Sequence, residues 1–88
     1  YFMEKEAEVK ELIKKHLPAD RAKEGLFYLK EYSNLIASNI NSEDEKIILR
    51  NSLINTGINI REFQKEMVGL KISYSEVYHG CLDLETEI

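Results

Sequence analysis

The side chains of this chain that most often bind metals or act as nucleophiles are two histidines and one cysteine. His79 and Cys81 stand two residues apart, and His16 lies far from both. A structural zinc site needs four ligands, and one His with one Cys do not make such a site. The sequence also has no glycine-rich phosphate loop, no His-Glu-x-x-His pair and no spacing typical of a Ser/His/Asp or Cys/His nucleophile. We therefore predict no metal, no cofactor and no enzymatic activity.

Tyrosines are the candidates for a protein-binding surface. Tyrosine is enriched at interfaces because it buries a large area and keeps a polar tip. The alternative is that each one lies at the margin of the core with its hydroxyl in water. The candidates are Tyr28, Tyr32, Tyr74 and Tyr78.

A small basic cluster marks the corner between the first two expected helices. Its members are Lys14, Lys15, Arg21 and Lys23. The cluster could meet an acidic partner or a phosphate, but a solvated corner is the simpler interpretation.

The segment Ile60–Gly80 resembles a DNA-binding helix-turn-helix unit, in which a helix, a short turn and a second helix follow one another. That resemblance would give DNA contacts to Lys65, Lys71, Tyr74, Ser75 and Tyr78. However, the turn is about two residues too long for the motif. Residues 61–88 also hold three basic residues against six acidic ones, which repels phosphate. We therefore expect ordinary helical packing here, with DNA binding as the alternative.

Three helix-start signatures determine the expected architecture. Each places Ser or Asn three residues before Glu, the pattern of a capping box. The pairs are Ser42 with Glu45, Asn59 with Glu62, and Ser73 with Glu76. Two hydrophobic staples accompany the later boxes, Ile58 with Phe63 and Ile72 with Val77.

Apolar spacing together with these signals predicts an all-α, single-domain bundle of four to five helices, two longer ones followed by three short ones. The expected ranges are Glu4–Leu17, Ala19–Ile40, Glu43–Thr56, Ile60–Val68 and Tyr74–His79. Gly57, Gly69 and Gly80 are expected to end the last three helices. The alternating tail, residues 81–88, is compatible with an edge strand, an extended arm or more of the last helix.

Two features of the expected helices predict packing. Ile47, Ile48 and Leu49 cover more than one face, so the third helix is expected to be central. The second helix has more apolar residues than one neighbour covers, which predicts a homodimer through the first or second helix.

Gly25 lies inside the expected second helix. Because glycine is unfavourable in a helix interior, it indicates either that a neighbouring helix packs closely there or that the helix begins later.

Composition limits the class of protein. The chain has 88 residues, 43% of them hydrophobic, and a net charge of −4, which disfavours nonspecific binding to nucleic acid or anionic membrane. One cysteine cannot form an internal disulfide, so a reducing, cytoplasmic setting is expected. No apolar run approaches a membrane span. Tyr1 and Phe2 are interpreted as a cloning remnant, which leaves residues 3–88 as the domain.

These observations favour a small non-enzymatic module that binds another protein. Its size and charge are typical of inhibitors or immunity-type regulators from phages and other mobile elements. The alternatives are a helix-turn-helix transcriptional regulator and a structural homo-oligomer. The partner's identity does not follow from the sequence.

Overall fold

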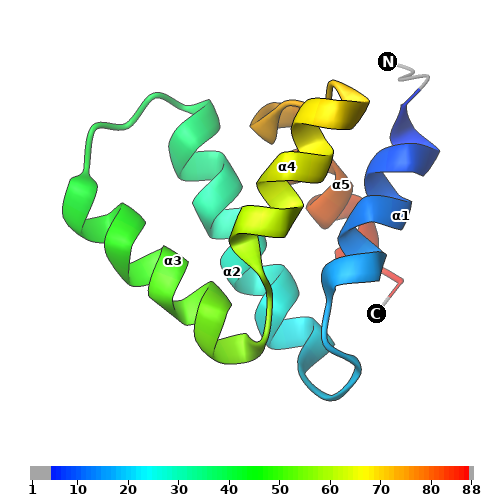
Figure 1. Ribbon diagram of the computed structural model, residues 1–88, viewed down its shortest axis with the longest axis horizontal. Helices are drawn as coiled ribbons and strands as arrows, with labels where there is room; N and C mark the ends of the chain where they lie inside the picture. The colour runs from blue at the N-terminus through cyan, green and yellow to red at the C-terminus, as the bar shows by residue number, and fades with distance from the viewer. Residues whose placement is uncertain (1–4, 88) are drawn as a thin grey trace.

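The computed structural model describes residues 5–87, and within them it contains five α-helices and no strand (Figure 1). The predicted all-α class is confirmed. The helices are α1 (Glu6–His16), α2 (Ala22–Ala37), α3 (Glu43–Thr56), α4 (Ile60–Leu70) and α5 (Tyr74–Glu85). A short 3₁₀ turn, Ala19–Arg21, joins α1 to α2. Tyr1 and Phe2, the expected cloning remnant, lie outside the described residues.

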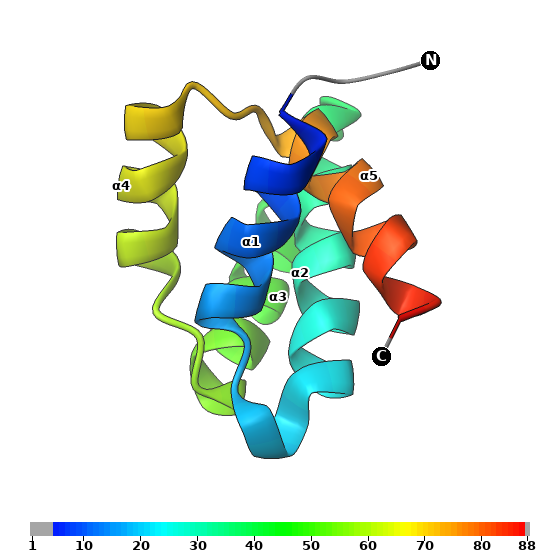
Figure 2. The ribbon, with the colours of Figure 1, turned by 90° about the vertical axis from the view of Figure 1, so that its right-hand side faces the viewer.

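Helix α2 lies in the middle of the fold. It packs against α5 and α3, and α5 also packs against α1 (Figures 1 and 2). Helix α4 makes few backbone contacts but contributes three buried side chains to the common core, Ile60, Phe63 and Met67. Because every helix supplies residues to one apolar cluster, the chain folds around a single core.

The three predicted helix starts are correct, although only one capping box forms completely. Glu76 N donates to Ser73 Oγ over 3.2 Å, and Ser73 N donates to Glu76 Oε1 over 2.9 Å. Asn59 forms half of a box, because its Oδ1 accepts only from the backbone of the third helical residue. Ser42 makes no side-chain cap hydrogen bond, so the box predicted there is wrong, yet α3 still begins at Glu43.

Only one of the three glycines expected to end a helix does so. Gly57 has φ of 104° and ends α3 as predicted. Helix α4 continues through Gly69, and Lys71 takes the left-handed position with φ of 57°. Helix α5 continues through Gly80 to Glu85, so most of the alternating tail extends the last helix.

At Gly25 the later helix start is confirmed, and the close neighbours are loop residues rather than another helix. The second helix begins at Ala22, three residues after the expected start, because residues 19–21 form the 3₁₀ turn. A Cβ on Gly25 would lie 3.1 Å from Ile58 Cδ1 and 3.2 Å from Leu17 Cδ2. The glycine therefore lets two loops approach this end of α2 closely.

The expectation of a central third helix is wrong. Ile47 is 56% exposed and Ile48 is 63% exposed, and the buried residues of α3 are Leu53 and Thr56. Helix α3 lies at an edge of the fold, mainly against α2 (Figure 1). Three consecutive helical residues point in directions 100° apart, so a single neighbour covers at most part of such a run.

The reason given for a dimer through the first or second helix also fails. The apolar stripe of α2, which comprises Leu26, Leu29, Tyr32 and Leu35, is buried within the chain itself. Of the large apolar side chains of α2, Phe27 remains exposed. Among the described residues, exposed aliphatic side chains lie on α3 (Ile47, Ile48 and Ile54) and on α4 (Val68 and Leu70) instead.

Helix α5 approaches α1 closely at Gly80. A Cβ there would lie 2.7 Å from Val9 Cγ1 and 3.0 Å from Ile13 Cδ1. Gly80→Ala is therefore expected to lower the free energy of unfolding by about 1–3 kcal/mol through overpacking.

Gly69 is the matched control, because nothing lies within 4 Å of its Cβ position. Gly69→Ala should raise stability by up to about 1 kcal/mol, since alanine favours helix. Urea denaturation measures both values, and equal effects would contradict the close approach at Gly80.

Candidate functional site

A groove of about 830 Å³ lies between α1 and α4. The two helices run side by side on one face of the molecule (Figure 2). The residues that line this α1–α4 groove are Ala7, Glu8, Glu11, Leu12 and Lys15 from α1 and Glu66, Gly69 and Leu70 from α4.

The floor and one wall of the groove are apolar. Leu12 is buried and forms part of the floor, whereas Leu70 is partly exposed at the edge. Gly69 has no side chain, and nothing lies within 4 Å of its Cβ position, so the backbone of α4 is open to close approach. An incoming apolar side chain would therefore meet carbon atoms and accessible backbone rather than a polar surface.

The wall supplied by α1 is acidic. Glu8 and Glu11 are exposed, lie three residues apart on one helix face, and form no ion pair within residues 5–87. The basic residue that lines the groove, Lys15, is already paired with Glu66. The groove therefore combines an apolar floor with unneutralised negative charge.

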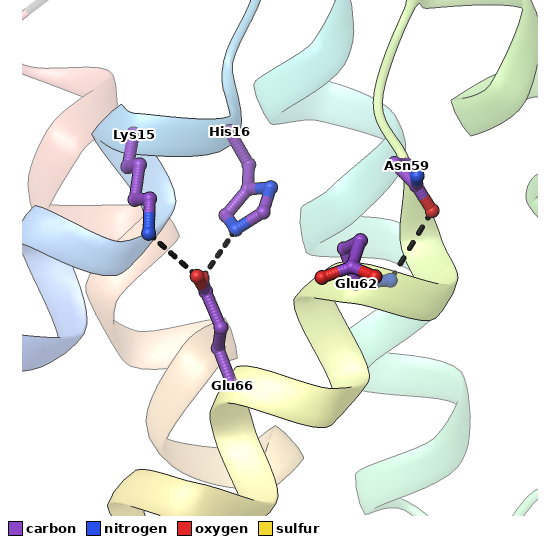
Figure 3. A network of polar contacts seen from close by, with 5 residues as sticks. All are labelled: Lys15, His16, Asn59, Glu62 and Glu66. Carbon is purple, nitrogen blue, oxygen red and sulfur yellow. Dashed lines mark hydrogen bonds and ion pairs between the residues drawn. The ribbon is translucent and has the colours of Figure 1, made fainter.

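A cluster of polar contacts closes one end of the groove (Figure 3). Glu66 on α4 accepts from Lys15 Nζ and from His16 Nε2, each over 2.5 Å. Both donors stand in the last turn of α1. Their hydrogen bonds lower the pKa of Glu66, the one from Lys15 more than the one from His16. Because an ionised carboxylate only accepts hydrogen bonds, His16 Nε2 must carry a proton.

The opposite end of α1 is held by a different contact. Lys5 Nζ donates to the backbone carbonyl of Lys71, the left-handed residue after α4, over 2.5 Å. Between these two ends the helices make few direct contacts. Polar contacts thus hold α1 and α4 together at their ends and leave the space between them open.

The Glu66 cluster predicts a pH dependence of stability. A carboxylate whose pKa is lower in the folded than in the unfolded chain stabilises the fold above its ordinary pKa of about 4.5. That stabilisation is lost as the pH falls through the lower, folded pKa. Glu66→Gln should therefore be less stable than the wild type near neutral pH, and the difference should shrink in acid. Denaturant melts from neutral pH to pH 3 measure this difference.

Glu62 provides the matched control for that series, since it is exposed on the same helix and forms no ion pair within residues 5–87. Glu62→Gln should leave stability nearly unchanged. A stability difference for Glu66→Gln that persisted undiminished at pH 3 would contradict the role of the ionised carboxylate.

The four candidate tyrosines do not form one surface. Tyr32 is buried and packs edge-on against Tyr74, with ring centroids 5.8 Å apart. The hydroxyl of Tyr74 accepts from Gln64 Nε2 over 2.7 Å, and burial raises its pKa. Tyr28, Tyr74 and Tyr78 are half-buried, and Tyr28 and Tyr74 pack against the core. Tyr32 therefore serves the packing of the fold, while the other three tyrosines keep part of their surface in solvent.

The segment that resembles a helix-turn-helix unit lacks the mutual packing of that motif. Helices α4 and α5 make few contacts with each other, and α5 packs into the core against α2 and α1. Lys65 and Ser75 are exposed on separate helices, and Lys71 lies at the end of α4, where its carbonyl binds Lys5. The five residues that would contact DNA therefore do not form one recognition face on α5.

Three of the four residues of the basic corner contact other parts of the chain, two of them through ion pairs. Lys14 lies 3.7 Å from Glu87, and Lys15 pairs with Glu66. Arg21 donates to the carbonyl of Asn55 over 3.2 Å. A partner with negative charge would have to displace these contacts, so the corner is a weak candidate for an anion site.

Residues suited to metal or thiol chemistry do not gather. Within residues 5–87, no three His, Cys, Asp or Glu side chains lie close enough to hold a metal ion. Cys81 is buried, and burial raises the pKa of its thiol to about 12, which makes it a poor nucleophile.

Sequence patterns missed the α1–α4 groove because its two walls come from segments about fifty residues apart. A local signal existed at Gly69 and Leu70, where an exposed apolar residue follows a helical glycine, but that signal alone does not identify a groove.

Comparisons with known protein families, with curated proteins and with solved structures found no match. Among the described helices, none has the length and apolar character needed to cross a membrane. The surfaces of this chain are therefore the basis for inferring its function.

Proposed function

We propose that this chain is a non-enzymatic protein-binding module whose α1–α4 groove binds a basic amphipathic helix of another protein. The observation that supports this proposal is the combination of an apolar floor with an acidic wall in one groove. Ligand sites of proteins occur preferentially in such concave, largely apolar surfaces.

A helix is the occupant that fits the shape of the groove. The space between two side-by-side helices accepts a third helix, whose apolar residues at positions i, i+3 and i+4 enter the groove. Leu12 and Leu70 provide apolar contacts for such anchors. Backbone exposed at Gly69 allows the incoming helix to approach closely.

Charge determines which helix would bind. Glu8 and Glu11 would pair with Lys or Arg residues along the edge of the partner helix, which favours basic over acidic helices. Because a module of this size that covers a helix also blocks it, we propose a regulator or inhibitor acting in the cytoplasm. The reducing compartment inferred from the single cysteine is consistent with that setting.

The test uses a displayed library of helical peptides selected against the purified chain. Selected peptides should share an apolar stripe flanked by Lys or Arg. Their binding should fall by about tenfold or more in a Glu8→Lys/Glu11→Lys variant, because charges adjacent to the ligand are reversed. Leu70→Asp should abolish binding by placing a charge beside the apolar floor.

A double variant remote from the groove provides the control. Asp20→Lys/Glu24→Lys changes the net charge by the same amount at exposed positions of the 3₁₀ turn and α2. It should keep the affinity of the selected peptides. A library that yields no binder, or binders that respond equally to both double variants, would contradict the proposal.

A further inference from the structure

Gly69 differs from the other three glycines of the chain, because nothing in the described fold requires a glycine there. Gly57 takes a left-handed conformation, and a Cβ on Gly25 or on Gly80 would crowd neighbouring side chains. Gly69 lies in the last turn of α4, and among residues 5–87 nothing lies within 4 Å of its Cβ position. Glycine is less favourable than alanine at such a helical position. The missing side chain therefore lowers the stability of α4 without serving its packing.

Gly69 and Ala7 are the smallest residues that line the α1–α4 groove, and they come from its two walls. Both are exposed. Each lies two residues along the chain from the contact in which Lys5 Nζ donates to the carbonyl of Lys71, so both belong to the same end of the groove. Little side-chain volume fills this Ala7–Gly69 end, which leaves room there for a side chain from outside the chain.

We propose that the Ala7–Gly69 end of the groove receives one large apolar side chain of the partner helix, and that Gly69 thereby determines which helices bind. This inference rests on the proposed function of the groove. A leucine, methionine or phenylalanine side chain would lie against the exposed backbone at Gly69 and against Leu70. Burial of this anchor stabilises the complex, whereas any side chain at position 69 would occupy the same space.

The charges of the groove determine where the basic residues of the partner stand relative to this anchor. Glu8 directly follows Ala7 in α1, and Glu11 lies one turn further on the same face. Beyond them, Lys15 is already paired with Glu66. Because Glu8 and Glu11 both lie within about one turn of Ala7, a Lys or Arg of the partner should stand within about four residues of the anchor. The expected partner motif is therefore a large apolar residue with a basic residue on the same or the next helical turn.

The first test compares the stability of Gly69 variants with their affinity for peptides that were selected on the wild type. Gly69→Ala should raise the urea midpoint, because alanine favours helix. The same variant should weaken peptide binding, and Gly69→Leu should weaken it by about tenfold or more, because the added side chain overlaps the anchor. A fold that becomes more stable while its binding becomes weaker distinguishes a binding role of Gly69 from a structural one.

The second test changes both partners. Replacing the large apolar residue shared by the selected peptides with alanine should weaken binding to the wild type by about tenfold or more. The truncated peptide should bind Gly69→Leu at least as well as the untruncated peptide does, because leucine fills the space that the anchor leaves. Val68→Leu is the control for added bulk, since Val68 is 79% exposed and is not a lining residue of the groove. It should bind the selected peptides like the wild type.

The outcomes separate this inference from the proposed function. Full affinity of the selected peptides for Gly69→Leu would overturn the anchor at Gly69, and so would selected peptides that share no large apolar residue. If those peptides still lost affinity in Glu8→Lys/Glu11→Lys, binding in the groove would stand without the anchor. A library that yields no binder would overturn both proposals.

Discussion

Replacing Phe63 with alanine is expected to lower the free energy of unfolding by about 3–5 kcal/mol, a large share of the total for a domain of this size. Phe63 is fully buried and is the largest such side chain in the described core. Its ring also meets His16 edge-on, with centroids 5.3 Å apart, beside the cluster that joins α1 to α4. Alanine would leave a cavity and remove the support beneath that cluster.

Val68 supplies the control on the same helix, because it is 79% exposed. Val68→Ala should change stability by no more than about 0.5 kcal/mol. Urea melts of both variants at neutral pH give the comparison. Similar values for the two would contradict the placement of α4 with Phe63 in the core.

Helix starts were predictable because their signals are local. Ser73 and Glu76 satisfy each other within one turn, so no distant segment is needed to form the box. Ile58 and Phe63, expected as a hydrophobic staple, are both buried in the common core. The short-range pattern thus identified the start of α4 and one of its core residues.

Helix ends were less predictable because a glycine has several uses. Gly57 adopts the left-handed conformation that a glycine stop requires. Gly80 instead provides space for Val9 and Ile13, a requirement set by α1 at the other end of the chain. Only the tertiary packing distinguishes these two roles, and sequence spacing assigned the same role to both.

The position of α3 and the existence of the α1–α4 groove could not be predicted from local patterns either, because both depend on tertiary packing. Ile47 and Ile48 have the composition of core residues, but the number of neighbours around a helix determines how many are buried. The contact between Glu66 and Lys15 joins segments that no periodicity relates. Sequence therefore predicted the helical class and most helix starts, while the candidate surfaces required the fold.

Leu53→Ala is expected to lower the free energy of unfolding by about 2–5 kcal/mol. Leu53 is fully buried and, together with the partly buried Leu49, joins α3 to the common core. Its carbonyl also accepts from Ile58 N and Thr56 Oγ1 at the end of the helix. Loss of its side chain would therefore loosen the attachment of α3 to α2 and α4.

Two comparisons isolate that effect. Ile54→Ala removes the neighbouring, half-exposed aliphatic side chain and should cost little. Ser73→Ala removes one complete capping box at an exposed helix start and should cost about 1 kcal/mol. The expected order of destabilisation is thus Leu53→Ala, then Ser73→Ala, then Ile54→Ala, measured by urea melts at low micromolar concentration. Leu53 and Ile54 are adjacent aliphatic residues of similar size that differ chiefly in burial. An equal loss of unfolding free energy in the two variants would therefore mean that α3 does not pack on the core through Leu53.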